Sequence, residues 1–447
     1  MGLWFASALL PEGWKRNVRI ELKGGLIASV ESDRQPEQAD ERHAVALPGM
    51  PNVHSHTFQR AMSGLTEIRG DSDDSFWTWR ETMYRFVDRL DPDDVEAIAA
   101  LAFAEMLESG FTRVGEFHYL HHDRDGRSYS GIAELSERIA AAAAETGIGL
   151  TLLPVFYAHG GFGGKSPGAS QRRFVTDLDA YARLLSGARR AIAPLPDARI
   201  GFAPHSLRAV TPEELRELIA MNEREPIHIH IAEQKREVEE CEAWSGRRPV
   251  RWLIEEMPVD QRWCLVHATR MDDQEVLELA STGATAGLCP ITEANLGDGI
   301  FSAPAFVEAG GAIGVGSDSN VRIDLPLELS LLEYGQRLKL QRRNVMAHGA
   351  GQSTGRSLYA AAWSGGARAL GQPAGGIEAG AAADIVALAD HESTVPETIL
   401  DRWIFGARSN LVDTVWRYGR IVVREGRHVS RDAISARYGR SMARLMA

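Results

Sequence analysis

Cysteine is scarce in this chain of 447 residues, which contains only Cys241, Cys264 and Cys289. The number is odd and none of the three stands in a Cys-x-x-Cys pair, so the sequence indicates no disulfide framework. We interpret all three as small, buried apolar side chains. Free thiols are typical of a reducing compartment, so we expect a cytoplasmic protein.

Long apolar runs are missing as well. No stretch approaches the roughly 20 apolar residues that a bilayer-spanning helix needs. The apolar N-terminal stretch has no basic region before it and is interrupted by Pro11 and Glu12. It therefore predicts a strand and a turn instead of a signal peptide, and we expect no membrane partner.

Basic residues are outnumbered, because 49 Lys and Arg stand against 61 Asp and Glu, with a formal net charge of −12. Nucleic-acid binding needs a basic surface that neutralises phosphates, so this balance argues against it. An anionic substrate would need arginines close to its binding site to overcome the same negative field.

Eight strand-like segments alternate with helical ones. They are ALPGMPNVHSH, FTRVGEFHY, IGLTLLPVFY, RIGFAPHSL, PIHIHIAE, WCLVHAT, TAGLCPIT and AIGVGSDSN. The stretches between them have an apolar period of 3.6 residues. Eight such repeats predict an α/β protein whose parallel sheet closes into a (β/α)8 TIM-type barrel. An open doubly wound sheet is the alternative, but no Gly-rich phosphate loop follows the first strand.

Strand-rich sequence at both chain ends predicts a second, smaller unit. Residues 1–47 and 372–430 alternate β-like runs with turn residues. We expect them to form one discontinuous β-sandwich domain beside a barrel of residues 48–371. Residues 431–447 predict a basic amphipathic helix. A membrane-surface role is one interpretation of this helix, but we favour packing on the protein body or on a second subunit, and we expect a homodimer.

Histidines and one aspartate recur where predicted strands end. His54 and His56 lie two apart on the first strand, so the strand period points both to one side. His230 ends the fifth strand, His267 the sixth and Asp318 the eighth. A single buried histidine is more often a satisfied core residue than a ligand. However, the C-terminal ends of barrel strands share one mouth, and imidazoles with one carboxylate suit zinc or iron(II).

The motifs PNVHSH, HIHIAE, LVHAT and GSDSN, in this order, make the chain resemble the amidohydrolase superfamily over nearly its full length. The resemblance implies that His54, His56, His230 and Asp318 bind one divalent metal ion, zinc or alternatively iron(II), and that His267 lies near the reacting water. The superfamily often bridges two metal ions with a carbamylated lysine on the fourth strand. The third and fourth predicted strands contain no lysine, so we expect a single ion.

Glu233 stands three residues after His230, where the fifth strand gives way to a loop. Taken alone it would be a solvated carboxylate at a helix start. Beside a metal ligand it becomes a candidate proton shuttle, because deamination needs an acid for the departing nitrogen. We predict attack by a metal-activated water, with Asp318 accepting its proton, His267 orienting it and Glu233 protonating nitrogen.

Further segments, HTFQRAMSGLTE, FWTWRETMYRF, EFHYLHH, CPITEANLGDGIF and LLEYGQRL, resemble the formimidoylglutamate deiminase family. That resemblance implies hydrolysis of N-formimino-L-glutamate to N-formyl-L-glutamate and ammonia in histidine breakdown. It also implies the substrate contacts Gln59, Arg80, Tyr119, His205 and Arg208. A guanidinium binds a carboxylate with two parallel hydrogen bonds, so two arginines suit a dicarboxylate substrate. The alternative for each arginine is a surface ion pair.

Other polar and aromatic residues receive a structural interpretation. The glycine-rich loop around His159 is an ordinary loop or a mobile lid. We expect Trp77 and Trp79 to serve packing, with an aromatic wall for the substrate as the alternative. The segment EANLGDG, with Glu293 and Asp298, is typical of turns and caps. Asn320 occupies a position where the family resemblance implies His.

Two other functions stay open. A nucleobase or aminotriazine deaminase of the same superfamily would need a flat apolar slot and no pair of arginines. A catalytically inactive barrel could serve as a scaffold, but such a protein should have lost ligands or the acid, and all of them are present.

Overall fold

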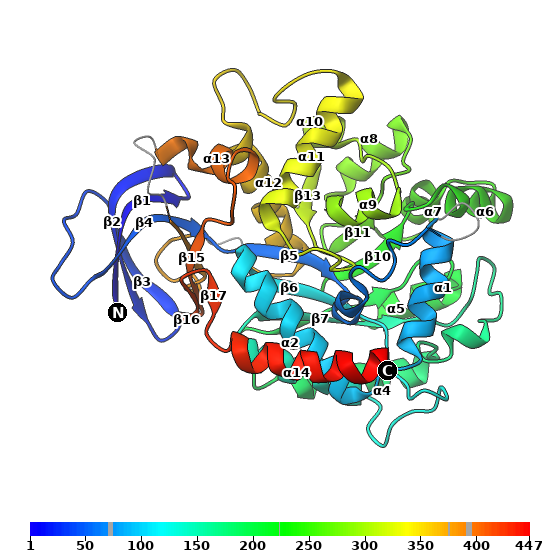
Figure 1. Ribbon diagram of the computed structural model, residues 1–447. Helices are drawn as coiled ribbons and strands as arrows, with labels where there is room; N and C mark the ends of the chain where they lie inside the picture. The colour runs from blue at the N-terminus through cyan, green and yellow to red at the C-terminus, as the bar shows by residue number, and fades with distance from the viewer. Residues whose placement is uncertain (70–74, 223, 374–375, 390–395) are drawn as a thin grey trace.

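Parallel strands form the centre of the molecule (Figure 1), eight in all when β8 and β9 are counted as one divided strand. The computed structural model describes residues 1–69, 75–222, 224–373, 376–389 and 396–447. The barrel strands are β5 (Met50–Ser55), β6 (Phe111–His118), β7 (Gly149–Phe156), β8 (Arg199–Ile200) with β9 (Ala203–Pro204), β10 (Ile227–Ile231), β11 (Trp263–His267), β12 (Thr285–Leu288) and β13 (Ala312–Val315). All residues of β5, β6 and β7 are buried, as expected for parallel strands that are covered on both faces.

The sheet closes on itself at two places. β13 pairs with β5 at Asn52, and β10 bridges to the residues around β9 at Ile227 and His230. The prediction of a (β/α)8 barrel is therefore confirmed. The fourth strand is shorter than expected from the sequence, because it is divided into β8 and β9.

Helices follow the strands and surround the barrel. They are α1 (Phe76–Val87), α2 (Pro92–Ser109), α3 (Glu134–Thr146), α4 (Leu178–Ile192), α5 (Pro212–Ala220), α6 (Lys235–Ser245), α7 (Pro249–Glu256), α8 (Asp273–Thr282), α9 (Pro290–Leu296), α10 (Ala303–Glu308), α11 (Leu325–Leu340), α12 (Thr354–Ala369), α13 (Ile399–Phe405) and α14 (Arg431–Met446), with the 3-10 helices η1 (Thr57–Met62), η2 (Ala169–Gln171) and η3 (Pro396–Thr398). Asp91 caps α2 ahead of its first proline, and Thr211 caps α5 in the same way.

The two chain ends build a separate mixed sheet, as predicted. Its order is β17 (Arg427–His428), β16 (Arg420–Arg424), β15 (Val412–Arg417), β14 (Ile385–Leu388), β4 (Glu41–Pro48), β1 (Gly2–Leu10), β2 (Gly13–Lys23) and β3 (Leu26–Glu31). These strands are hydrogen-bonded in one continuous sheet, whereas we expected a sandwich of two. Most of their buried apolar side chains gather in a core cluster of their own. The proposed boundaries after residues 47, 371 and 430 stay a prediction.

A partly buried ion-pair network joins this sheet to the N-terminal end of the barrel. Arg113 on β6 donates to Asp384 at 2.8 Å, and Arg417 on β15 donates to the same carboxylate at 3.3 Å. Both arginines also pair with Asp197, which precedes β8. The small sheet therefore supports the end of the barrel that lies opposite the strand termini described below.

The C-terminal helix packs on its own barrel. α14 lies along α2 (Figure 1), with Ile434 and Leu445 buried. Arg444 pairs with Asp91 at 2.6 Å and Arg431 with Glu105 at 3.1 Å. These contacts correspond to the expected packing on the protein body.

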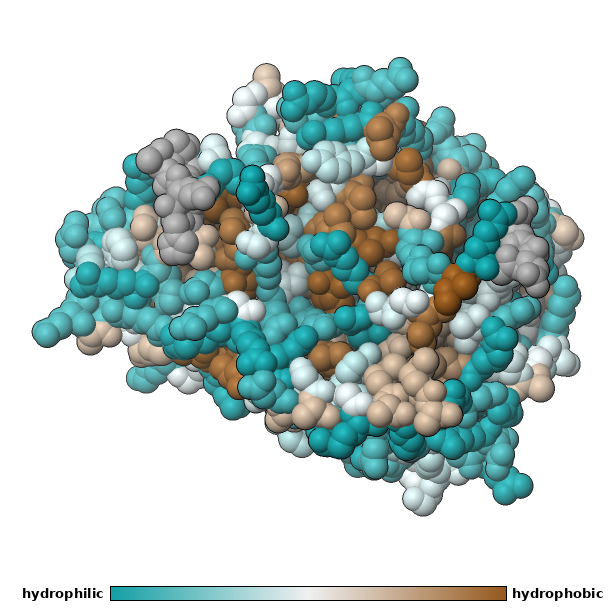
Figure 2. All heavy atoms as spheres, viewed as in Figure 1, coloured by the Kyte–Doolittle hydropathy of each residue, from teal (hydrophilic) through white to brown (hydrophobic). Residues whose placement is uncertain are grey.

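Figure 2 shows apolar residues in the recesses of one face of the molecule, with mostly hydrophilic residues on the surface around them. Within the described ranges, none of the helices combines the length and the hydrophobicity that crossing a membrane requires.

Candidate active site

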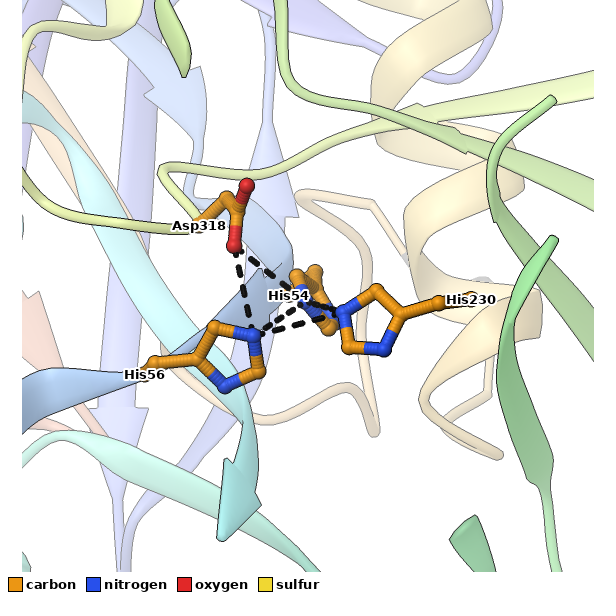
Figure 3. Close-up of side chains that lie close together, drawn as sticks. All are labelled: His54, His56, His230 and Asp318. Atoms are coloured by element: carbon orange, nitrogen blue, oxygen red, sulfur yellow. Dashed lines mark hydrogen bonds and ion pairs between the residues drawn. The ribbon is translucent and has the colours of Figure 1, made fainter. Parts of the chain in front are cut away.

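Four side-chain atoms that could bind a metal ion lie close together at the C-terminal end of the barrel (Figure 3). The Nε2 atom of His54 lies 3.1 Å from that of His56 and 3.0 Å from that of His230, and the latter two are 3.3 Å apart. Asp318 Oδ1 lies 3.5 Å from His54 Nε2 and 3.3 Å from His56 Nε2. A tetrahedral zinc ion with bonds of about 2.0–2.1 Å separates its ligand atoms by roughly 3.3–3.4 Å. The spacing therefore suits one small divalent ion.

The imidazole orientations also fit a cation. His56 Nδ1 lies 2.8 Å from the carbonyl oxygen of Phe117, and His230 Nδ1 lies 3.1 Å from that of His205. A carbonyl only accepts, so each Nδ1 donates a hydrogen and each Nε2 keeps a lone pair. Burial lowers the pKa of His54 to about 3 and that of His230 well below its usual range. Neutral imidazoles whose lone pairs face one another repel unless a cation lies between them.

Backbone pairing of the last and first strand regions holds this group together. The Asp318 N–H donates to the His54 carbonyl, and the His56 N–H donates to the Asp318 carbonyl, both at 2.9 Å. Gly316 permits the approach, because a Cβ there would lie 2.8 Å from the His54 backbone. Asn320 donates to the serine hydroxyl that ends β5 at 3.1 Å and to the Asp318 carbonyl at 2.9 Å. This unusual residue therefore ties the two regions together.

Two further buried groups adjoin the four donor atoms. His267 Nε2 lies 3.7 Å from Glu233 Oε1 and 3.7 Å from Asp318 Oδ2. Burial raises the pKa of Glu233 to about 7, so this carboxyl can hold a proton near neutral pH. Burial opposes ionisation of Asp318, but the neighbouring imidazoles of His54 and His267 keep the pKa of Asp318 below its usual range. Carboxyls with such divergent pKa values suit acid and base roles.

Residues of EANLGDG stand directly behind His267. Glu293 Oε1 lies 3.4 Å from His267 Nδ1 and accepts a hydrogen bond from the Cys289 N–H at 2.9 Å. Burial would lower the pKa of His267, but the charge of Glu233 and the hydrogen bond to Glu293 raise it well above its usual range. Asp298 is fully buried. One of its carboxylate oxygens lies within 4.8 Å of a carboxylate oxygen of Glu233 and of a ring nitrogen of His267. The interpretation of this segment as turn and cap residues is therefore incomplete.

A cavity opens beside these groups. All five residues implied as substrate contacts line it: Gln59, Arg80, Tyr119, His205 and Arg208. Gln59 Nε2 donates to the Tyr119 hydroxyl at 2.7 Å. In the described part of the chain, Gln59 Oε1 and Arg208 Nη1 are buried without a hydrogen-bond partner. Such atoms are costly unless a bound molecule supplies the partner.

The two arginines bring positive charge to this cavity. Burial would lower the pKa of Arg208, but the charges of Glu237 and Glu233 raise it, so the guanidinium stays ionised. Arg80 comes from α1 and lies with its Cζ atom 4.5 Å from the centre of the Trp77 ring. Trp79, which we expected to serve packing, lines the cavity.

Sequence reasoning misses most of the apolar wall. It consists of Phe76, Met83, Tyr84, Tyr157, Phe174 and Leu296. Phe76, Met83, Tyr84 and Leu296 lie in segments that carry the family resemblance, but their place in a cavity wall was not predicted. Tyr157 stands immediately after β7, which could have indicated its position. His159 pairs with Glu214 on α5 at 2.9 Å, and its loop contributes Gly160 to the wall.

Two family patterns match the chain. The family described as "Amidohydrolase family" matches residues 45–422. The one described as "Formimidoylglutamate deiminase HutF, N-terminal domain" matches residues 4–44. The two matches together reach from the first strand to β16.

Individual relatives agree with these patterns. Formimidoylglutamate deiminase of Pseudomonas aeruginosa is 52% identical over 95% of this chain and 95% of its own. The crystal structure of an amidohydrolase from Brucella melitensis is 50% identical, with a TM-score of 0.97 over 100% of both chains. A 5-methylthioadenosine/S-adenosylhomocysteine deaminase of Natronomonas pharaonis is 28% identical over 95% of this chain and 92% of its own. The chain belongs to the amidohydrolase family and, within it, to the family of formimidoylglutamate deiminases.

Proposed function

We propose that this chain hydrolyses N-formimino-L-glutamate to N-formyl-L-glutamate and ammonia in histidine degradation. The Pseudomonas aeruginosa relative carries the name of this activity. The structural observation that supports it most is Arg208, which lines the cavity next to the His–Asp group while its buried Nη1 finds no partner among the described residues. A carboxylate of the substrate supplies that partner.

The metal-binding role falls to His54, His56, His230 and Asp318. Those residues would hold a divalent ion, whose chemistry here would be to make water acidic enough, with a pKa of roughly 7, to serve as a nucleophile at neutral pH. Three imidazoles and one carboxylate favour zinc, with iron(II) as the alternative. We propose a single ion, because β7, β8 and β9 contain no lysine that could bridge a second one.

Three side chains transfer protons or orient the attacking water. Asp318, ionised at neutral pH, accepts a proton from the attacking water, and His267 orients that water. The water oxygen bonds to the formimino carbon, and the π electrons of the C=N bond move to nitrogen. Glu233 delivers a proton to this nitrogen. Because the cationic formimino nitrogen already carries two hydrogens, this proton makes it a leaving ammonia; collapse forms the C=O bond and breaks the C–N bond. The hydroxyl proton passes to Glu233, which regains its acid form, and Asp318 returns its proton to solvent.

The substrate carboxylates bind to Arg80 and Arg208, whose guanidinium groups form charge-assisted hydrogen bonds. Gln59, Tyr119 and His205 add neutral hydrogen-bonding groups to the same cavity. These contacts provide local positive charge in a chain with a formal net charge of −12.

A nucleobase or aminotriazine deaminase is the second candidate function. The 28% identical relative from Natronomonas pharaonis, whose name gives a nucleoside substrate, favours it. A flat ring would pack on the aromatic wall and would leave both arginines without a role. The scaffold alternative has no support, since the ligand set and the acid are all present.

Ammonia release from N-formimino-L-glutamate, measured beside adenosine, guanine and cytosine with the metal-loaded protein, tests the proposal. We expect release from the first compound alone. Release from a base alone would overturn the substrate and keep the reaction type. No release from any compound, with zinc, iron(II) or manganese supplied, would favour the scaffold.

We also propose a cytoplasmic location and a homodimer. The three cysteines are free and buried, which is consistent with a reducing compartment. The homodimer has less support, because α14 packs on α2 of its own chain. Sedimentation equilibrium of the purified protein tests it.

A further inference from the structure

Three arginines surround one indole at the rim of the barrel mouth. The Cζ atoms of Arg80 and Arg236 each lie 4.5 Å from the centre of the Trp77 ring, and that of Arg208 lies 5.9 Å from it. We call these four residues the Trp77 cluster. A guanidinium at such a distance is attracted by the negative face of the ring. Through these contacts, the cluster links the chain segments that carry its four residues.

Members of the Trp77 cluster come from distant parts of the barrel. Trp77 and Arg80 lie on α1, which follows the first strand, β5. Arg208 follows the fourth strand, and Arg236 lies on α6 after the fifth strand, β10. The first and fifth strands of a closed eight-stranded barrel lie across from each other. Contact between Trp77 and Arg236 therefore brings α1 across the mouth to α6, and the two helices lie near each other in Figure 1.

The position of α1 determines where Arg80 lies. Among the described elements, α1 has its main contacts with the short helices η1 and η2. It contributes Phe76, Trp79 and Arg80 to the cavity wall. A contact that fixes the N-terminal turn of α1 therefore also fixes this part of the cavity wall, which includes Arg80, one of the two proposed carboxylate-binding groups.

Arg236 provides such a contact, because its guanidinium lies against the Trp77 ring. It does not line the cavity, and its Nε donates to Glu240 Oε1 on the same helix at 2.7 Å. We propose that Arg236 and Trp77 are positioning residues. Their contact, which we call the latch, holds α1 over the barrel mouth so that Arg80 faces a substrate carboxylate. This inference rests on the proposed function, because it assigns Arg80 to that carboxylate.

Substitution of Arg236 tests the latch. We expect Arg236→Ala to raise KM for N-formimino-L-glutamate roughly two- to fivefold with kcat nearly unchanged, the size that follows from one exposed cation–π contact. Arg236→Lys, which keeps a cation, should restore most of the affinity. Lys235→Ala is the matched control, since Lys235 forms the same kind of pair with Glu239 on α6, at 3.5 Å, and has no aromatic contact in the described structure.

A double-mutant cycle separates positioning from general disturbance. In an Arg80→Ala background, Arg236→Ala should leave KM unchanged, because the latch acts through Arg80. An equal rise of KM in both backgrounds would overturn the proposal.

Hydrogen exchange provides a readout that needs no turnover. Amides of residues 76–87 should exchange faster in Arg236→Ala than in the wild type or in Lys235→Ala, while those of the barrel strands stay unchanged. Unchanged exchange of α1 would overturn the latch. A wild-type protein that does not hydrolyse N-formimino-L-glutamate would instead overturn the proposed function. Hydrogen exchange of α1 would still decide whether Arg236 holds this helix.

Discussion

Glu116 accepts two hydrogen bonds from Thr57, one from its backbone N–H at 2.8 Å and one from its hydroxyl at 2.6 Å. Thr57 directly follows His56, and Glu116 lies on β6, which pairs with β5. The fully buried carboxyl therefore fixes the turn that presents His54 and His56.

Removal of this carboxyl should loosen the metal site. Glu116→Ala leaves two buried donors of Thr57 without a partner, so we expect the free energy of unfolding to fall by about 2–4 kcal/mol and the metal affinity to fall with it. Glu116→Gln keeps an accepting oxygen and should change little at pH 5, where the carboxyl is neutral. Denaturant titration and metal analysis check both variants. Full metal content in a destabilised Glu116→Ala protein would contradict the role.

The same residue predicts a pH dependence of stability. Burial raises the pKa of Glu116 from its ordinary 4.5 to about 7. A raised pKa in the folded state means that the neutral carboxyl stabilises fully below pH 4.5 and that this contribution is lost as the pH rises through about 7. Relative to Glu116→Gln, the wild type should lose on the order of 3 kcal/mol of unfolding free energy between pH 5 and pH 8. Denaturation of metal-saturated proteins measures the difference, and a constant value would argue against it.

Metal removal should abolish turnover. We expect ammonia release to fall to background after exhaustive chelation and to return when zinc is added back, because the reacting water needs the ion. Asp318→Asn should prevent the recovery. Asp93→Asn is the control, since that carboxylate is exposed on α2. Hydrolysis that persists in demonstrably metal-free protein would refute the mechanism.

Loss of either cavity arginine should weaken substrate binding. Arg80→Ala and Arg208→Ala remove charge-assisted hydrogen bonds and should raise KM roughly 10- to 150-fold with a smaller effect on kcat. Arg85→Ala offers a matched control, because Arg85 lies exposed on the same helix and bonds only to Thr82 in the described structure. Steady-state kinetics decides. Nearly intact turnover in both cavity variants would favour a ring substrate.

Glu293 should matter for the rate rather than for binding. Glu293→Gln removes the carboxylate 3.4 Å from His267 Nδ1, so we expect kcat to fall about 10- to 100-fold, with KM and metal content little changed. Rates and metal analysis of the purified variant test this. A wild-type kcat would restore the turn-and-cap interpretation.

The sequence suffices to predict the fold and the convergence of the metal-site candidates, because both follow from periodicity. Strand ends of a parallel barrel share one mouth, so His54, His230 and Asp318 could be expected to meet although they are far apart in the chain. Relatives of known activity then narrow the substrate class.

Contacts made across strands could not be predicted. Glu293 reaches His267 from α9, the helix that follows the neighbouring strand β12, and a cap residue has the same local sequence. Glu116 is a single carboxylate in the strand FTRVGEFH, a signal that is visible only once the strand is known to be buried on both faces. The partners of Trp77 depend on how α1 crosses the mouth, which no local pattern encodes.

The small sheet imposes an order on biosynthesis. β4 lies between β1 and β14, and β14 comes from the far end of the chain. While the ribosome is still making the barrel, β4 has a neighbour on one side only and exposes an open hydrogen-bonding edge, which invites pairing with other nascent chains. Chaperone protection during translation is therefore most valuable at these first strands, well before the catalytic centre exists.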